Sequence, residues 1–219
     1  MKTFAAVILL VSVLNTSSAS AQLLRWYGFK VGPTVADQRF VYSSNWPDYI
    51  PYPNLPTRHL WGFEAGVFVE FLNLPYFSLV SEVDYSQKGR IITIDVVALD
   101  NNSPFGYVDL GPQDQTLRFH YISIPILAKF RLQTPTITPF VAFGPRFEYL
   151  VSHPSSPVYD KFNRLEVAAS ASAGIEMDLG ILPEILLEIV YSPSLTYAYR
   201  NEFVTVNNRV IALLVGASL

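Results

Sequence analysis

Cysteine is absent from the 219 residues, which excludes disulfides, thiolate metal sites and cysteine nucleophiles. Charged residues make up only 15% of the chain, against about 25% in ordinary soluble domains. The basic residues form no run, so nucleic acid is not an expected partner. Although 50% of the residues are hydrophobic, no segment after residue 21 is apolar for long enough to form a spanning helix.

The first residues have the layout of an export signal. Lys2 is followed by a short apolar segment, 4–14, and then by Ala19-Ser20-Ala21, which matches an A-x-A cleavage site. We therefore predict a signal peptide over 1–21 and a single functional domain over 22–219. An exported, cysteine-free and strongly apolar chain without a spanning helix has one other way to cross a bilayer. A closed β-barrel pairs every backbone polar group internally.

Apolar residues recur with a period of two, as in strands. In 164–179, Leu165, Val167 and Ile175 share one face, while Glu166 and Glu176 share the other. The same alternation occurs in 61–71, 77–86, 121–132 and 139–149. The segments 26–35, 184–192 and 206–219 complete about eight strands, and the facing of the last one is ambiguous.

The connections alternate between short and long. Segments 72–75, 133–137 and 180–183 are short, whereas 37–59, 95–116, 151–163 and 197–205 are long and rich in Pro, Asn, Asp and Ser. Short periplasmic turns and long external loops are typical of outer-membrane barrels. The predicted fold is an all-β, transmembrane, antiparallel up-and-down β-barrel of about eight strands. Four prolines fall within predicted strands and should sit at bulges or near a rim: Pro33, Pro125, Pro145 and Pro193.

The predicted inward faces carry charges of both signs. One interpretation is a charged pore or a proton-active site. The other is an ion-paired network that plugs the lumen, because eight strands leave room only for side chains. We favour the plug, with Arg146 as a central cation pairing with carboxylates such as Glu64, Glu82, Glu148 or Glu176. The predicted network is Lys30, Glu64, Glu82, Asp84, Lys129, Arg131, Arg146, Glu148, Glu166 and Glu176; Glu70, Asp178 and Glu188 fall on the same faces.

Aromatic residues cluster near the predicted strand ends, where membrane barrels carry interfacial girdles. The turn-end set is Tyr27, Phe71, Tyr76, Phe77 and Phe130, and the loop-end set is Tyr85, Phe119, Tyr121, Tyr149 and Tyr191. The first long segment, 37–59, is also aromatic. It either contacts a partner or packs on itself over the barrel mouth. This candidate contact surface comprises Phe40, Tyr42, Trp46, Tyr49 and Tyr52.

Histidines offer the remaining route to catalysis. His120 and Ser123 are three residues apart on a strand and should point to opposite faces. His59 and His153 lie in separate predicted loops without an identifiable acid partner, and scattered histidines make a poor metal site. We predict no catalytic residue, no metal and no cofactor.

Four segments resemble the Bacteroidetes outer-membrane β-barrel family, often called PorT-like or porin-family proteins. Gly28-Phe29-Lys30-Val31-Gly32 is similar to its opening strand, and Glu82-Val83-Asp84-Tyr85-Ser86-Gln87-Lys88-Gly89 to its third. The segment 121–129 is similar to its fourth strand and 139–145 to its fifth, which makes Pro125 and Pro145 family features. The chain departs from many barrels in ending on Ala217-Ser218-Leu219 instead of an aromatic residue.

The leading hypothesis is a non-enzymatic bacterial outer-membrane protein, structural or partner-binding through its external loops. Its partners would be outer-membrane lipid and another envelope protein or an extracellular ligand. Two alternatives remain: a small-solute pore, and an exported soluble β-barrel that binds a small apolar ligand and turns its aromatics inward.

Overall fold

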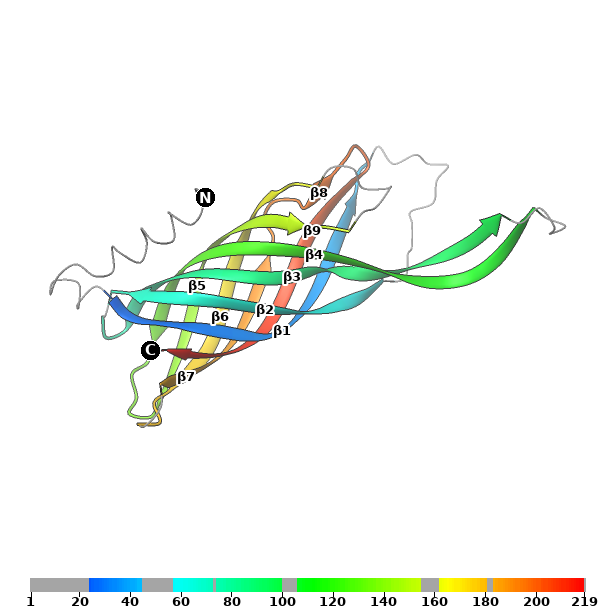
Figure 1. The fold of residues 1–219 in the computed structure, drawn as a ribbon. Coiled ribbons are helices and arrows are strands. Elements are labelled where there is room, and N and C mark those ends of the chain that lie inside the picture. The colour runs from blue at the N-terminus through cyan, green and yellow to red at the C-terminus, as the bar shows by residue number, and fades with distance from the viewer. Residues whose placement is uncertain are drawn as a thin grey trace, which may run out of the picture.

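The computed structural model describes residues 24–44, 57–72, 74–99, 106–154, 162–180 and 183–218. These residues form one antiparallel sheet in the order β1-β2-β3-β4-β5-β6-β7-β9-β8, and β1 pairs with β9 so that the sheet closes (Figure 1). The strands are β1 (Leu24–Tyr42), β2 (Thr57–Phe71), β3 (Phe77–Leu99), β4 (Tyr107–Arg131), β5 (Ile137–Ser152), β6 (Leu165–Met177), β7 (Glu184–Pro193), β8 (Tyr199–Arg200) and β9 (Val204–Ser218).

The predicted fold class is confirmed, with β1 to β7 and β9 forming the ring and β8 adding a short piece whose ladder partner is β9. Among the described residues, no helix is long and apolar enough to cross a bilayer. The predicted signal peptide, 1–21, lies outside the described residues and stays a prediction.

The barrel wall follows the period-two pattern of the sequence. In β5, Val141, Phe143 and Phe147 are exposed on the outer face, while Arg146 and Glu148 are buried in the lumen. The last strand, whose facing the sequence left open, turns Leu214 inward and Leu213 outward. Both neighbours of β9 hold it in place, because Val215 pairs with Val31 of β1 and with Leu187 of β7.

Two predicted loops contain strand residues. The β1 strand continues to Tyr42, and β2 begins at Thr57, so 37–42 and 57–59 belong to the wall. The prediction of a loop over 95–116 was wrong, because β3 and β4 stay paired as far as Leu99 and Tyr107. Figure 1 shows this β3–β4 hairpin projecting well beyond the rest of the barrel, at the end opposite the chain's C-terminus.

Three of the four strand prolines lie in continuous register, so the predicted bulges are wrong for them. Pro33 pairs with Phe63 and Pro145 with Ala169 without a shift. Around Pro125 the β3–β4 ladder keeps one register on both sides. Pro193 ends β7. A proline removes only one donor from a ladder, and the neighbouring strand pairs preserve the alignment.

Small apolar layers separate the charged groups inside. Near the turn end, buried apolar residues from β2, β3, β4, β5 and β7 pack together: Phe68, Val80, Leu127, Phe140, Ala142 and Leu186. Near the loop end a second layer comprises Ile92, Leu117, Phe119, Tyr121 and Leu150. Phe119 and Tyr121 therefore face the lumen, and placing them in an outer aromatic girdle was wrong. The outer-face aromatics include Tyr27, Tyr76, Phe130, Tyr149 and Tyr191, each at least 42% exposed.

Candidate functional site

The lumen holds the buried charged side chains of the barrel and is the candidate site. All ten residues of the predicted lumen network are at most 7% exposed. Glu70 and Glu188, which shared the predicted inward faces, are buried as well. Asp178 is not part of it: it is exposed in the turn after β6, where its Oδ1 accepts a hydrogen bond from the Gly180 amide at 2.8 Å. Strand β6 ends at Met177, so the period-two alternation that predicted an inward side chain does not extend to Asp178.

At the turn end, Glu70 of β2 holds three cations. Arg25 Nη1 donates to its carboxylate at 2.6 Å, Lys129 Nζ at 3.0 Å, and Arg131 also contacts it. Lys129 extends the cluster to Glu176, and Arg131 donates to the Ser78 hydroxyl. Residues from β1, β2, β3, β4 and β6 meet here, so the cluster crosses the lumen.

In the middle of the barrel, Lys30 of β1 bridges two carboxylates. Its Nζ lies 2.8 Å from Glu82 of β3 and 2.9 Å from Glu188 of β7. The alternation of β1 places Lys30 between Gly28 and Gly32 on the inner face. The lysine reaches strands on both sides of its own, β3 and β7.

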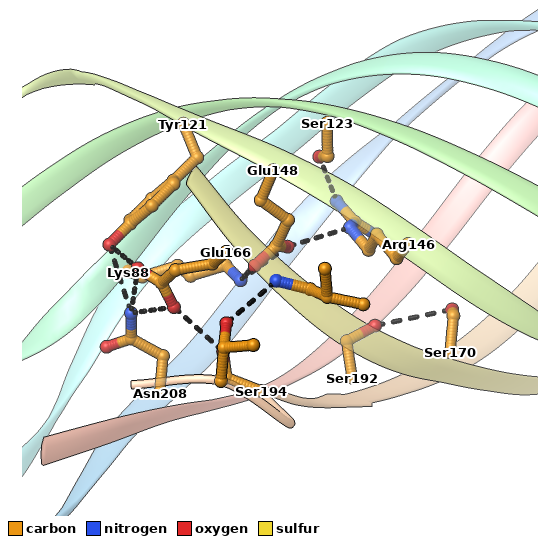
Figure 2. A network of polar contacts seen from close by, with 12 residues as sticks. Lys88, Tyr121, Ser123, Arg146, Glu148, Glu166, Ser170, Ser192, Ser194 and Asn208 are labelled. Carbon is orange, nitrogen blue, oxygen red and sulfur yellow. Dashed lines mark hydrogen bonds and ion pairs between the residues drawn. The ribbon is translucent and has the colours of Figure 1, made fainter. Parts of the chain in front are cut away.

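Towards the loop end, Arg146 of β5 lies between Ser123 and Glu148 (Figure 2). Its Nη2 lies 3.0 Å from Glu64 and 3.5 Å from Asp84, and its Nε lies 3.1 Å from Glu148. Nη2 also donates to Ser123 at 2.7 Å. Of the four carboxylates expected around it, Arg146 contacts Glu64 and Glu148. Glu82 pairs with Lys30, and Glu176 pairs with Lys129 and Arg25.

Lys88 is a central member that the sequence interpretation missed. Its Nζ lies 2.5 Å from Glu148 and 5.0 Å from the centre of the Tyr121 ring. The third strand was predicted to end at Ser86, two residues before Lys88, whereas β3 runs to Leu99. Because residues two apart share a face, extending that strand by one pleat would have placed Lys88 inside with Ser86.

Glu166 is the buried carboxylate that is held by hydrogen bonds and not by an ion pair among the described residues. Tyr121 Oη donates to Oε1, and Ser194 Oγ donates to Oε2 at 3.0 Å. Asn208 Nδ2 donates to the same carboxylate at 3.2 Å (Figure 2). Gln38 Nε2, on β1, donates to Asn208 Oδ1 at 3.0 Å. Charge-assisted hydrogen bonds of this kind stabilise a carboxylate away from water.

The balance of buried charge explains why Glu166 is held by hydrogen bonds from neutral donors. Eight carboxylates and six cationic side chains are buried in the described chain. A buried charge without compensation is very costly. Seven of the carboxylates contact a cation, and Glu166 is satisfied by neutral donors. The lumen is thereby closed by polar groups that hold one another.

None of the three histidines hydrogen-bonds a serine hydroxyl in the described part of the chain. His120 lies on the outer side of β4, where its Nδ1 is 2.5 Å from the Tyr85 hydroxyl, whereas Ser123 is buried beside Arg146. His59 is exposed in β2, and His153 Nδ1 lies 3.0 Å from the carbonyl oxygen of Pro154. Over the described ranges, no three His, Asp or Glu side chains are arranged to hold a metal ion.

The predicted aromatic contact surface is divided. Phe40 and Tyr42 belong to strand β1, paired with Val206 and Val204 of β9, and placing them in a loop was wrong. The guanidinium of Arg90 lies 4.2 Å from the centre of the Phe40 ring. Trp46, Tyr49 and Tyr52 lie outside the described residues, so their contact role stays a prediction.

A family model described as "Outer membrane protein beta-barrel domain" matches residues 17–200. The chain belongs to this family. The family and the closed barrel together confirm the predicted location in the bacterial outer membrane and exclude the soluble ligand-binding alternative.

Solved structures of outer-membrane proteins are similar to this chain at low sequence identity, and OprG shows the same fold. OprG from Pseudomonas aeruginosa is 9% identical, with a TM-score of 0.52, and the match covers 90% of this chain and 97% of OprG. Neisserial surface protein A is 13% identical, with a TM-score of 0.44, over 87% of this chain and 97% of its own. The outer membrane enzyme PagL is 9% identical, with a TM-score of 0.41, over 87% and 99%. No curated protein sequence matches the chain significantly.

Proposed function

We propose that this chain is a non-enzymatic outer-membrane barrel whose lumen is closed to solutes and whose active surface is its external end. The observation that carries the proposal is the set of ion pairs inside the lumen, many of which join strands that are not neighbours in the ring. The turn-end cluster, the Lys30 bridge and the Arg146 cluster follow one another along the barrel.

The remaining space supports a closed lumen. Two cavities border the turn-end and middle charge groups, with volumes of about 10 and about 20 Å³. A single water needs about 10–15 Å³. Neither cavity is large enough for a hydrated ion or a small solute, so conduction would require the ion pairs to open.

The rival function is a small-solute pore, and planar-bilayer recording separates the two. We expect the wild-type barrel to give no ohmic steps of porin size. A variant without the central plug, Glu64→Ala with Arg146→Ala and Glu148→Ala, should conduct if it still shows heat-modifiable migration on gels. Stable porin-like steps from the wild type would contradict the closed lumen.

The β3–β4 hairpin supports a partner-binding role. Its projecting part exposes Val97 (60%), Leu99 (91%) and Leu110 (51%). Exposed apolar side chains away from lipid are characteristic of contact sites. A photo-crosslinking side chain at Leu99, compared with one at Leu132 near the turn end, tests this in whole cells. Discrete adducts from position 99 are expected; equal labelling at both positions would leave the hairpin with no special role.

The finer family assignment is also a proposal. The motifs around Lys30, Asp84 and Pro125 support membership of the PorT-like Bacteroidetes branch. In this proposal residues 1–21 are removed on export, which N-terminal sequencing of the membrane-extracted protein would test by finding Gln22 first.

A further inference from the structure

The projecting part of the β3–β4 hairpin has two sheet edges of its own (Figure 1). The ladder between β2 and β3 reaches as far as Thr57 and Ile92. Beyond that pair, the segment 93–99 of β3 has β4 as its ladder partner among the described residues. On the other side, the ladder between β4 and β5 starts at His120. We call the outer side of 93–99 the β3 edge and the outer side of 107–116 the β4 edge.

The backbone of the β4 edge is irregular. Asp95 pairs with Pro112 and Val97 with Asp109, so the step from 95 to 97 on β3 faces the longer step from 109 to 112 on β4, and the extra residue belongs to β4. Gly111 has a φ of 73°, and its amide donates to Asp109 Oδ1 at 2.8 Å. The proline at 112 has no amide donor. Bulges, prolines and charged side chains protect an edge against the addition of another strand.

The β3 edge has the opposite character. Its sequence contains neither proline nor glycine, and four of its seven residues are β-branched: Thr93, Ile94, Val96 and Val97. Such residues favour strands, and an apolar edge strand pairs readily with other chains. At about 3.3 Å per residue the edge is about 23 Å long, which suits a strand of ordinary length. One hairpin therefore carries one protected edge and one edge suited to strand addition.

The chain's own sequence before β2 is poorly suited to the β3 edge. Continuing the β2–β3 ladder past Thr57 would bring residues 51–56 against this edge. That stretch of sequence contains three prolines, each without an amide donor for a ladder: Pro51, Pro53 and Pro56. An extended segment from another chain can supply a donor at every residue, so it is the better occupant.

The charge of the hairpin favours a basic occupant. From 93 to 117 the sequence contains no lysine and no arginine but four aspartates: Asp95, Asp100, Asp109 and Asp114. Asp114 is paired with Arg58 at the base of the hairpin, whereas Asp95 and Asp109 are exposed on the two strands. A second copy of the chain would bring two acidic hairpins together, which like-charge repulsion opposes, while a basic segment would be attracted.

We propose that the β3 edge binds an extended segment of another envelope protein, with alternating basic and apolar residues, as an added strand. The inference rests on the partner-binding role proposed above for the hairpin and specifies how the partner binds. Main-chain hydrogen bonds supply the affinity, and alternate side chains supply the selectivity. On one face of β3, Ile94, Val96 and Ala98 favour apolar side chains. On the other face, Asp95 with its neighbour Asp109 favours lysine or arginine.

The test titrates the refolded full-length barrel, in zwitterionic micelles, against a fluorescent heptapeptide of alternating lysine and valine. Fluorescence anisotropy should show saturable binding. N-methylation of two neighbouring residues at the centre of the peptide removes a donor from each of its edges. This change should weaken binding at least about fivefold, the effect of losing one backbone hydrogen bond. A peptide of alternating glutamate and valine should show no saturable binding.

Matched variants compare the two edges of the hairpin. Val97→Lys with Leu99→Lys places lysines on the β3 edge, where they oppose strand addition and repel the basic peptide, so saturable binding should be lost. Val108→Lys with Leu110→Lys makes the same exchange on β4 and should keep the wild-type affinity. Heat-modifiable migration on gels identifies the folded variants. Equal loss of binding in both variants would show that the peptide responds to the charge of the hairpin alone, which overturns the proposal.

Equal binding of the plain and the N-methylated peptide, or no saturable binding to the wild type, would reject strand addition. Crosslinking from position 99 tests the partner-binding role separately, because side-chain contact alone is enough to form adducts. Wild-type dimers in native mass spectra that the peptide does not displace would assign the β3 edge to a second copy. Peptide binding that appears only after 45–56 is replaced by a glycine-serine linker would assign the edge to the chain's own segment. Either result would reject the partner version.

Discussion

Strands β3 and β4 pass through two environments, and the two halves of this one hairpin behave differently. Within the ring, Lys88 is 1% exposed and Phe119 is 2% exposed, because six further strands enclose their inner face. Beyond the ring, Leu99 is 91% exposed and Leu110 is 51% exposed. The backbone ladder is continuous through both halves apart from an irregularity between Asp95 and Val97.

The difference shows what each half depends on. In the ring, a side chain is fixed by partners from distant strands, so a substitution should change the stability of the whole barrel. In the projecting half, the chain is held by the ladder and by local contacts such as that between Arg58 and Asp114, which are 61% and 47% exposed. Substitutions there should change contacts with other molecules and leave the barrel intact.

The largest effect is expected from Arg146→Met. The substitution removes the cation shared by Glu64, Asp84 and Glu148 and leaves negative charge buried. Removing one partner of a buried ion pair costs about 3–5 kcal/mol. Urea unfolding in lipid vesicles, followed by tryptophan fluorescence, measures the free energy of unfolding.

Arg58→Met is the matched control for that experiment. Its ion pair with Asp114 is exposed, and exposed pairs contribute about 0–1 kcal/mol. If Arg146→Met unfolds at the same urea concentration as Arg58→Met, the lumen cluster does not carry the stability assigned to it.

A smaller loss is expected from Tyr121→Phe. Glu166 loses the phenolic donor, and Asn208 Nδ2 loses the acceptor that it meets at 3.1 Å. A buried polar group left unsatisfied costs about 1–3 kcal/mol. Tyr149→Phe is the comparison, since Tyr149 is 44% exposed on the outer wall. Equal unfolding free energies for the two variants would argue against an important Glu166 cluster.

The smallest effect on the barrel should come from Val97→Ser with Leu99→Ser. Surface substitutions usually stay within about 0.5 kcal/mol, so unfolding should be unchanged, while crosslinking from a photo-reactive side chain placed at Leu110 of the same hairpin should decline. Leu127→Ser is the contrast within the ring, because Leu127 is 3% exposed in an apolar layer. A large destabilisation by the hairpin pair would show that the projecting half supports the ring after all.

Much of the wall could be predicted because its two faces differ chemically. Leu165 and Glu166 alternate in a way that only a strand with one lipid face explains, and their exposure and burial follow that pattern. The projecting half of β3 was missed for the opposite reason. In 93–99 no residue is fully buried and the sequence shows no regular polar and apolar alternation, so the strand is defined by its pairing with β4.

Most of the lumen residues followed from the pattern, but only two of the four carboxylates predicted for Arg146 are its partners. Glu82 and Asp84 share one face of β3, yet Glu82 binds Lys30 and Asp84 binds Arg146. Which carboxylate meets which cation depends on the tilt and stagger of the ring, which a single sequence does not encode locally. Tyr121 was misplaced because a tyrosine near a strand end suits an interface, whereas here its hydroxyl meets a buried carboxylate.

The junction between β1 and β9 has a consequence for the order of folding. It joins residues from the two ends of the domain, with Lys30 opposite Gly216, so its contacts span nearly the whole chain. Loop closure over such a distance is entropically costly and slow. Until β9 arrives, both β1 and β7 are open sheet edges that can pair with other chains. A growing or truncated chain that lacks β9 is therefore the species most in need of a chaperone, and the final strand completes the barrel by removing both edges at once.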